Sequence, residues 1–398
     1  MRAYVAMKHN VSQLSDGESG QVVDVWLLGS VLMLLCIGLV MMGSASISVA
    51  ERQLHEPFYY IWRQSAYITV ALLISWGAFY VPINAWNKAG PYLLMFGVVL
   101  LALVLILGKE VNGSLRWIDL GVFNIQPSEL VKLFVVIFLA GYMLRRGEEV
   151  RTTIKGFLKP MMILSVVGIL LLLEPDFGSS VVIALTTLSM MFLGGVRLWQ
   201  FGVLMMVMTM ALGVLAYSSP YRVERLTSFL NPWADPFNSG FQLTQALIAF
   251  GRGEWLGVGI GGSVQKLFYL PEAHTDFLFA VISEELGLIG GLVVIALFVI
   301  IVFRALRIGH IALSQNEYFA GYLAFGLGLL LGFQAFINIG VNMGVLPTKG
   351  LTLPLMSYGG SSMVATCLAC VLLLRISSEY PPLDTASPGE HRKAHKRK

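Results

Sequence analysis

Charged residues and cysteines are scarce in this chain. Lys, Arg, Asp and Glu make up 13% of its 398 residues, about half of the roughly 25% that is usual in soluble domains. Only three cysteines are present, too few for the disulfide framework of a small secreted protein. The net charge of +4 and the hydrophobic share of 56% exclude a disordered chain. A soluble enzyme is nearly excluded as well, and a membrane protein is indicated.

Long apolar runs are what the sequence has in abundance. A membrane-crossing helix needs about 20 mostly apolar residues. The runs are continuous rather than alternating, which excludes a β-barrel. We therefore expect an all-α polytopic integral membrane protein with about ten transmembrane helices. The expected spans cover residues 25–44, 65–81, 92–107, 127–144, 157–173, 177–195, 198–217, 286–303, 318–339 and 358–374.

The basic residues between the spans predict the orientation. Most of them fall on the side that also holds both chain ends, and this bias places both termini in the cytoplasm. Residues 1–24 are polar and are expected to be a disordered N-terminus, residues 25–380 the transmembrane domain, and residues 381–398 a basic cytoplasmic tail. The tail is either a solvated end or a contact with anionic lipid or a cytosolic partner.

One connection between spans is much longer than the others. Residues 218–275 separate the seventh and eighth spans on the outer side, and their apolar stretches alternate with glycines. This composition is too apolar for a free linker, and it favours an amphipathic helix near residues 242–250. We therefore expect a large structured extracytoplasmic loop, of the kind that is more often functional than idle.

Several ionisable residues lie in or beside the expected spans, where an unpaired charge is costly. Glu129 and Lys132 are three residues apart and share a helix face, so they either form a buried pair or line a site. Glu174 and Asp176 either cap the next helix or face a cavity. The remaining residues of this kind lie before or within the eighth span and before the tenth: Glu272, His274, Asp276, Glu284, Glu285 and Lys349.

Their positions along the chain suggest different roles. Glu284 and Glu285 are expected to be first-turn or interfacial charges of the eighth span. Asp276 is either the N-cap of that span or a catalytic carboxylate. Glu174, Asp176, Asp276 and Lys349 all fall at the outer ends of expected helices, so we expect them to converge on one outward-facing cavity.

Four long motifs in this chain resemble those of the SEDS family (shape, elongation, division and sporulation). They are the loop from Asn231 to Gly287, QPSELVKL (126–133), EPDFGSS (174–180) and GVLPTKGLTLPLMSYGGSS (344–362). Within the family, NPWADPF and YLPEAHTDF are most similar to the cell-division branch. Two departures are visible: Trp255-Leu256 is transposed relative to the common pattern, and Phe268 stands where an acidic residue is common.

The resemblance implies a peptidoglycan glycosyltransferase that polymerises lipid II in the bacterial cytoplasmic (inner) membrane, enriched at the division septum. It also implies a cognate class B penicillin-binding protein, the septal transpeptidase, and other divisome membrane proteins as partners; nucleic acid is not among them. A lipid II flippase and a divisome scaffold are the alternative functions. A flippase would distribute polar groups along the full membrane depth, whereas here they cluster at the outer face.

The chemistry of such a polymerase needs a base and cations. A sugar 4-hydroxyl must lose a proton as it attacks the donor sugar, and Asp276 is the candidate general base, which the resemblance also assigns as the essential carboxylate. Cations should face the diphosphate leaving group, and the candidates are Lys349, Arg252 and Lys132. The other candidate substrate-binding residues are Glu129, Glu272, His274, Gln245 and Ser357. A divalent cation, Mg or Mn, is suggested by the family, although no ligand cluster in the sequence specifies one.

Overall fold

The computed structural model describes residues 23–111, 114–119, 121, 124–196, 229–238, 240–267, 269–347 and 350–382, together with residues 199, 202, 206, 210 and 213. Most of the expected seventh span, Phe268, Lys349 and nearly all of the two tails lie outside the described residues. Predictions on those segments therefore remain predictions.

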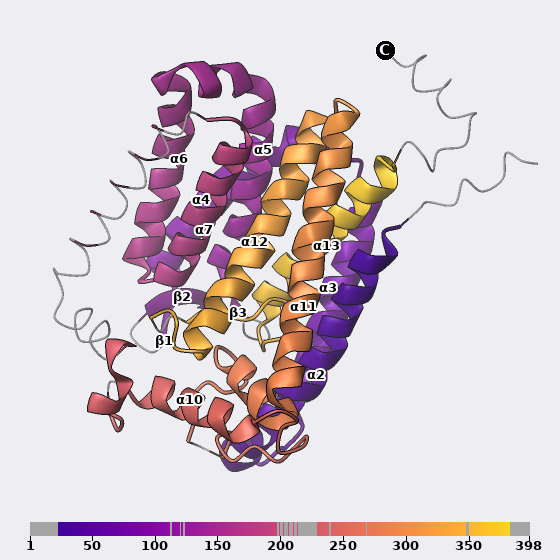
Figure 1. Cartoon of the computed structure of the whole chain (residues 1–398). Helices are drawn as coiled ribbons and strands as arrows, with labels where there is room; N and C mark the ends of the chain where they lie inside the picture. The colour runs from indigo at the N-terminus through magenta and orange to yellow at the C-terminus, as the bar shows by residue number, and fades with distance from the viewer. Residues whose placement is uncertain are drawn as a thin grey trace, which may run out of the picture.

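The described part of the chain is dominated by long helices, which lie side by side (Figure 1). Seven of them are long and apolar enough to cross a membrane: α2 (Val25–Leu54), α4 (Ile83–Leu107), α5 (Pro127–Thr152), α6 (Ile154–Leu173), α11 (Leu278–Ser314), α12 (Tyr318–Asn342) and α13 (Gly360–Glu379). The helices α3 (Tyr59–Phe79) and the shorter α7 (Phe177–Leu193) coincide with two further expected spans. The prediction of a helical membrane protein is confirmed.

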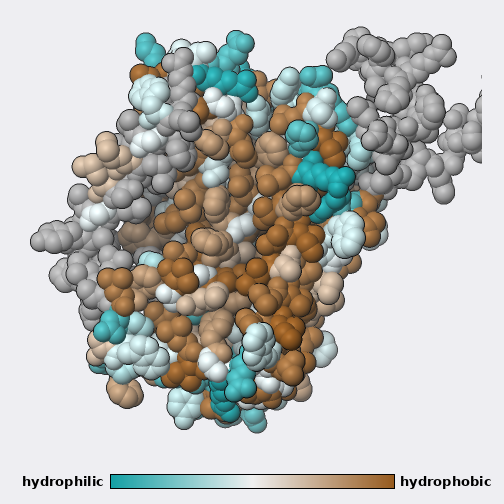
Figure 2. Space-filling view, viewed as in Figure 1, coloured by the Kyte–Doolittle hydropathy of each residue, from teal (hydrophilic) through white to brown (hydrophobic). Residues whose placement is uncertain are grey.

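Helices α5 and α12 form the centre of the bundle. In their most apolar windows, 89% of the α5 residues and 72% of the α12 residues are buried, against 28% for α4. The outer helices present apolar side chains to the surroundings, and Figure 2 shows a broad hydrophobic band between more hydrophilic ends. This pattern fits a bundle in lipid, because hydrocarbon accepts apolar side chains while polar ones must find partners inside.

One end of the bundle carries the non-spanning elements (Figure 1). Helix α10 (Phe241–Gly253), preceded by the short helix η1 (Pro232–Ala234), packs against α11 and α12. The expected amphipathic helix near 242–250 is thus confirmed and slightly longer.

A three-stranded antiparallel sheet at the same end was not expected. It comprises β1 (Lys109–Val111), β2 (Ser114–Asp119) and β3 (Asn124–Ile125), in that order, between α4 and α5. The strands are too short to give a readable alternation in the sequence, and their pairing satisfies the backbone of a tight connection between two helices. The all-α prediction is wrong in this detail, and the sheet matters because β2 carries Arg116.

Helix α11 begins eight residues earlier than the expected start at residue 286. Its first segment, residues 278–285, is buried on every side, so the prediction that Glu284 and Glu285 are first-turn or interfacial charges is wrong. A search for apolar runs starts the helix after two adjacent glutamates, because charged residues interrupt such a run. Here two basic residues compensate them: Arg252 of α10, at 3.4 Å from Glu284, and Lys266 of the segment between α10 and α11, at 2.7 Å from Glu285.

The helical path of α11 is broken at Gly287, which has φ 68° and ψ −168°. The external loop supplies backbone partners on both sides of this break. Val258 and Gly259 donate N–H groups to the carbonyls of Glu284 and Glu285, both at 3.0 Å. The N–H groups of Leu288 and Ile289 donate in turn to the carbonyls of Glu254 and Trp255, at 2.9 and 3.2 Å. The loop thus replaces hydrogen bonds that the break removes.

Candidate functional site

Asp276 lies two residues before α11, at the end of the bundle that carries α10 and the sheet (Figure 1). Its backbone carbonyl accepts hydrogen bonds from the side-chain amides of Asn338 and Asn342 on α12, both at 2.9 Å. The side-chain oxygen Oδ1 of Asn342 accepts a hydrogen bond from the backbone N–H of Ala280 at 3.1 Å. The N-cap of α11 is Phe277, so Asp276 is not the cap. These hydrogen bonds hold the backbone of Asp276 in place against α12.

Gly350 lies against the Asp276 carboxylate, and Arg116 of β2 lies near both. A β-carbon built on Gly350 would lie 2.9 Å from Asp276 Oδ2 and 3.8 Å from Arg116 Nη1, so only glycine leaves room there. Arg116 also donates to the backbone carbonyls of Glu174, at 3.5 Å, and Pro175. Three segments far apart in the sequence therefore meet at this carboxylate.

The surroundings of Asp276 favour its protonated form more than water does. Burial raises the pKa of this carboxyl to about 7, and the charges of Glu272, Asp176 and Glu129 act in the same direction. Arg116 opposes the shift. Such a pKa suits a general base at neutral pH, because the carboxylate is both populated and basic enough to take a proton.

The turn between α6 and α7 places Glu174 and Asp176 near Arg116. Asp176 caps α7, since its Oδ1 accepts the N–H of Ser179 at 3.2 Å; its Oδ2 accepts the hydroxyl of Ser128 at 2.8 Å. Glu174 is fully buried, and its carboxylate oxygens have no hydrogen-bond partner among the described residues. Burial and the charge of Asp176 raise the pKa of Glu174 to about 8, against the effect of Arg116. The capping role expected as one alternative is thus Asp176's alone.

The loop before α11 is tied to the loop before α13. Ser357 Oγ donates to the carbonyl of Thr275 at 2.6 Å, and the N–H of Tyr358 donates to the carbonyl of His274 at 3.0 Å. The His274 ring lies 4.8 Å from the Tyr60 ring, centroid to centroid. Burial lowers the pKa of His274, and Glu272 opposes this. The hydroxyl of Ser357 therefore connects the two loops.

The Glu129–Lys132 pair lies deeper in the bundle. Lys132 Nζ is 2.8 Å from Glu129 Oε1 and donates to Gln334 Oε1 at the same distance, and both ionic side chains are buried. A cavity of about 10 Å³ adjoins the three residues, close to the space of a single water molecule. The geometry is that of the buried pair expected as one alternative.

Of the remaining candidates, Glu272 lies close enough for its charge to raise the pKa of Asp276. Arg252 lies beside Glu284, its guanidinium partly exposed, and Gln245 is half-buried on α10. Glu272 is exposed and accepts the hydroxyl of Thr275 at 2.7 Å. Lys349 lies outside the described residues, next to Gly350. Within the described residues, no group of three or more His, Cys, Asp and Glu is arranged to hold a metal ion, and a divalent cation remains a prediction.

Sequence reasoning missed three residues at this site. They are Arg116, Asn338 and Asn342, none of which the sequence singles out as a candidate. The asparagines, four residues apart in an apolar helix, are a usable signal because a buried amide needs partners. Arg116 gave no local signal, since only the pairing of β2 with its neighbours brings it to Asp276.

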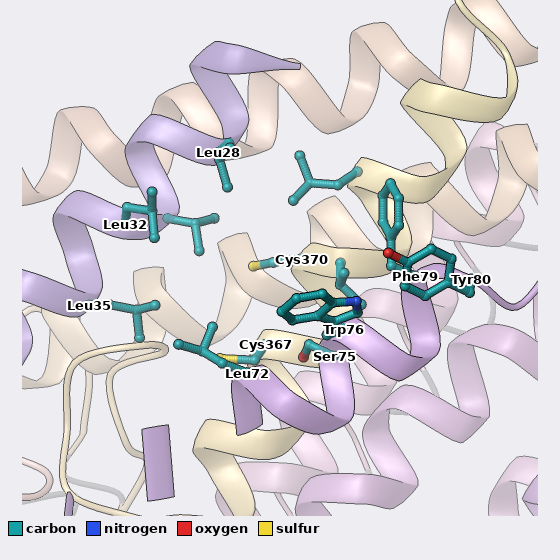
Figure 3. Close-up of a pocket in the computed structure, with 13 residues that line it drawn as sticks. Leu28, Leu32, Leu35, Leu72, Ser75, Trp76, Phe79, Tyr80, Cys367 and Cys370 are labelled. Carbon is teal, nitrogen blue, oxygen red and sulfur yellow. The ribbon is translucent and has the colours of Figure 1, made fainter. Parts of the chain in front are cut away.

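A larger hollow of about 390 Å³ lies elsewhere, between α2, α3 and α13. Figure 3 shows its wall of apolar side chains, including Leu32, Trp76 and Cys370. Its lining residues include Leu28 near the start of α2 and Leu374 near the end of α13. The two cysteines of α13, Cys367 and Cys370, are buried and line this hollow.

Comparisons with known proteins agree with one another. The family model for FtsW, RodA and SpoVE, described as "Cell cycle protein", matches residues 25–381. The chain is 58% identical over 358 residues to a protein of Nitrosococcus halophilus named "Probable peptidoglycan glycosyltransferase FtsW", with 89% of this chain and 92% of that one covered. A protein of the same name from Legionella pneumophila is 55% identical over 358 residues, with 89% and 91% covered.

Solved structures match over a similar length. A chain from work described as "Structural coordination of polymerization and crosslinking by a peptidoglycan synthase complex" aligns with a TM-score of 0.73 and 29% identity, covering 90% of this chain and 98% of that one. The rod shape determining protein RodA of Thermus thermophilus aligns with a TM-score of 0.67 and 26% identity, covering 90% and 98%.

Proposed function

Because this chain belongs to the FtsW, RodA and SpoVE family of cell cycle proteins, we propose that it is a peptidoglycan glycosyltransferase. It polymerises lipid II at the division septum, with Asp276 as general base. The observation that carries this role for Asp276 is its position. The residue is half-buried, its carboxyl has a raised pKa and lies near Arg116, and its backbone carbonyl is held by two asparagines.

The reaction joins two sugars and releases a polyprenyl diphosphate. The 4-hydroxyl oxygen of the acceptor forms a bond to the anomeric carbon of the donor, and the bond from that carbon to the diphosphate oxygen breaks. The hydroxyl proton passes to the Asp276 carboxylate. A positioned base of this kind contributes about 10²–10⁴-fold to the rate.

The leaving diphosphate needs positive charge nearby. Arg116 is the described cation that adjoins Asp276, and we add it to the candidates. Lys349 stays a candidate because it precedes Gly350, whose β-carbon position touches the Asp276 carboxylate. Arg252 is less well placed, since its guanidinium is bonded to Glu284. A bound Mg or Mn ion would help to neutralise the negative charge of the leaving diphosphate.

The finer topology and the partners belong to this proposal. Ten spans with both termini cytoplasmic put Asp276, α10 and the sheet at the outer face, where lipid-borne sugars are polymerised. The similarity to a chain of a peptidoglycan synthase complex supports a cognate class B penicillin-binding protein as partner, with other divisome membrane proteins around it.

The test is lipid II polymerisation by the purified protein with its cognate transpeptidase, with Asp276→Asn as the variant. Asp119→Asn is a matched control, because Asp119 is an exposed carboxylate of β2 on the same side of the bundle. Wild type and control should make glycan strands, and a folded, partner-binding Asp276→Asn protein should make none. Strands from that variant would overturn the role of Asp276.

Two other outcomes would favour the alternative functions. If neither protein made strands and lipid II crossed a liposome bilayer in their presence, the chain would be a flippase. If the variant lost no cellular function at all, a scaffold role would explain the family membership better.

A further inference from the structure

Three large apolar side chains stand exposed on the external loop beside α11. Trp255 is 69% exposed, Leu256 78% and Ile260 65%, and we call these three residues the loop patch. Isolated exposed apolar residues are ordinary, but several in one short segment mark an interaction surface. The loop patch includes Trp255-Leu256, where this chain departs from the common family pattern.

The backbone of the loop patch is fixed against α11, so the fold itself keeps these three side chains exposed. Its backbone is hydrogen-bonded to α11 on both sides of Gly287, as described above. A β-carbon at Gly257 would lie 2.2 Å from the carbonyl oxygen of Glu285, and one at Gly253 would lie 1.9 Å from that of Ser283. The loop therefore touches α11 backbone to backbone, which only glycine allows.

Buried charges fasten the end of the same loop. Lys266 Nζ is bonded to Glu285 at 2.7 Å and to Ser44 of α2 at 2.9 Å. Ser263 Oγ donates to Glu284. Because both ends of the loop are fixed, the loop cannot fold back and bury the patch residues without breaking these contacts.

The loop patch continues the apolar outer face of α11. The N–H of Ile289 is bonded to the carbonyl of Trp255 at 3.2 Å, and Ile289 belongs to the exposed stripe of this helix. The stripe comprises Leu288, Ile289, Leu292, Val293 and Val299, each at least 42% exposed. Because α11 is long and apolar enough to cross a membrane, this stripe meets hydrocarbon.

We propose that the loop patch inserts into the interfacial layer of the lipid leaflet next to this end of the bundle. Trp is enriched where hydrocarbon meets head groups, and the exposed Arg252 and Glu254 beside the patch suit the polar side of that layer. Since the loop is bonded to both sides of Gly287, the insertion also sets the depth of residues 278–285. It thereby sets the depth of Asp276 relative to the head groups, a consequence that matters only if the proposed function holds.

The experiment places an environment-sensitive fluorophore on single cysteines. Cys36, the exposed cysteine among the three, is replaced by Ser, and that protein is the labelling blank because Cys367 and Cys370 are buried. Trp255→Cys and Leu256→Cys are then labelled in nanodiscs of phosphatidylcholine and phosphatidylglycerol, with the chain by itself. Glu56→Cys, on the exposed turn between α2 and α3, is the water-facing control, and Val293→Cys is the lipid-facing control.

We expect both patch labels to emit at shorter wavelength than the Glu56 label. They should be quenched several-fold more by lipid spin-labelled near the head group than by a water-soluble quencher. Quenching by the soluble agent equal to that of the Glu56 label would overturn the proposal. Soluble quenching that is relieved only when the transpeptidase is added would overturn it too, and would assign the loop patch to a protein partner.

Discussion

The side-chain amide of Asn342 donates a 2.9 Å hydrogen bond to the backbone carbonyl of Asp276. Through its other end, Asn342 accepts the N–H of Ala280 in the first turn of α11. One fully buried side chain of α12 thus bridges the candidate base and the helix that follows it. Asp276 owes its position to α12 as much as to its own segment.

This bridge predicts the effect of Asn342→Ala. The change removes one of the two amide hydrogen bonds to the Asp276 carbonyl, which keeps that of Asn338, and one acceptor of the Ala280 N–H, which keeps the carbonyl of Phe277. Each lost hydrogen bond contributes about 0.5–1.5 kcal/mol to the unfolding free energy. We expect a lower melting temperature and a lower polymerisation rate, with the pH at half-maximal rate unchanged, because the Asp276 carboxyl keeps its neighbours. Asn87→Ala on α4, whose amide meets Arg145 near the surface, is the control and should change neither. A shifted pH midpoint in Asn342→Ala would argue against a purely positioning role.

The raised pKa of Asp276 predicts the pH dependence of the proposed reaction. Below about 7 the carboxyl is protonated and cannot accept the hydroxyl proton, so the rate should fall about tenfold per pH unit. Above that value the rate should reach a plateau. Glu272→Gln removes a charge that raises the pKa of Asp276, so its midpoint should move to lower pH. Initial rates on both sides of pH 7 measure this, and a flat wild-type profile would speak against Asp276 as the base.

The break in α11 predicts different costs for two glycine substitutions. Gly287→Ala puts a β-carbon 2.4 Å from the backbone nitrogen of Gly257, on a backbone with φ 68°. Gly259→Ala is the matched control, because Gly259 also has positive φ, 93°, yet no atom lies within 4 Å of its β-carbon position. The strain of such a backbone costs of order 1–3 kcal/mol in both, and Gly287→Ala adds the overlap. Melting temperatures in detergent should therefore fall clearly further for Gly287→Ala, and equal falls would mean that the loop does not dock as described.

The Glu129–Lys132 pair predicts recovery in a double variant. Lys132→Gln leaves Glu129 charged and buried, which costs about 3–5 kcal/mol. Adding Glu129→Gln removes that charge, and the double variant should recover most of the lost stability, as measured by thermal unfolding. No recovery would mean that the two side chains do not compensate each other. Polymerisation by the folded double variant then separates a structural pair, which leaves activity intact, from a pair that contacts substrate.

The sequence by itself determined the helical membrane fold, the helix α10 and the candidate carboxylate. These rest on local properties: apolar runs of sufficient length, amphipathic spacing, and an acidic residue at the start of a span in a family motif. The pairing of Glu129 with Lys132 was also readable, because residues three apart on a helix share a face.

Only the tertiary structure decided where α11 begins and what surrounds Asp276. Glu284 and Glu285 are helical and buried because Arg252 of α10 and, from the loop that follows it, Ser263 and Lys266 reach them; these partners lie 19 to 32 residues upstream in the chain. Arg116, Gly350 and Asn342 meet at Asp276 from segments separated by 60 to more than 150 residues. Such contacts depend on how helices and loops pack. A local sequence pattern does not predict them, because the partner residues are distant in the chain.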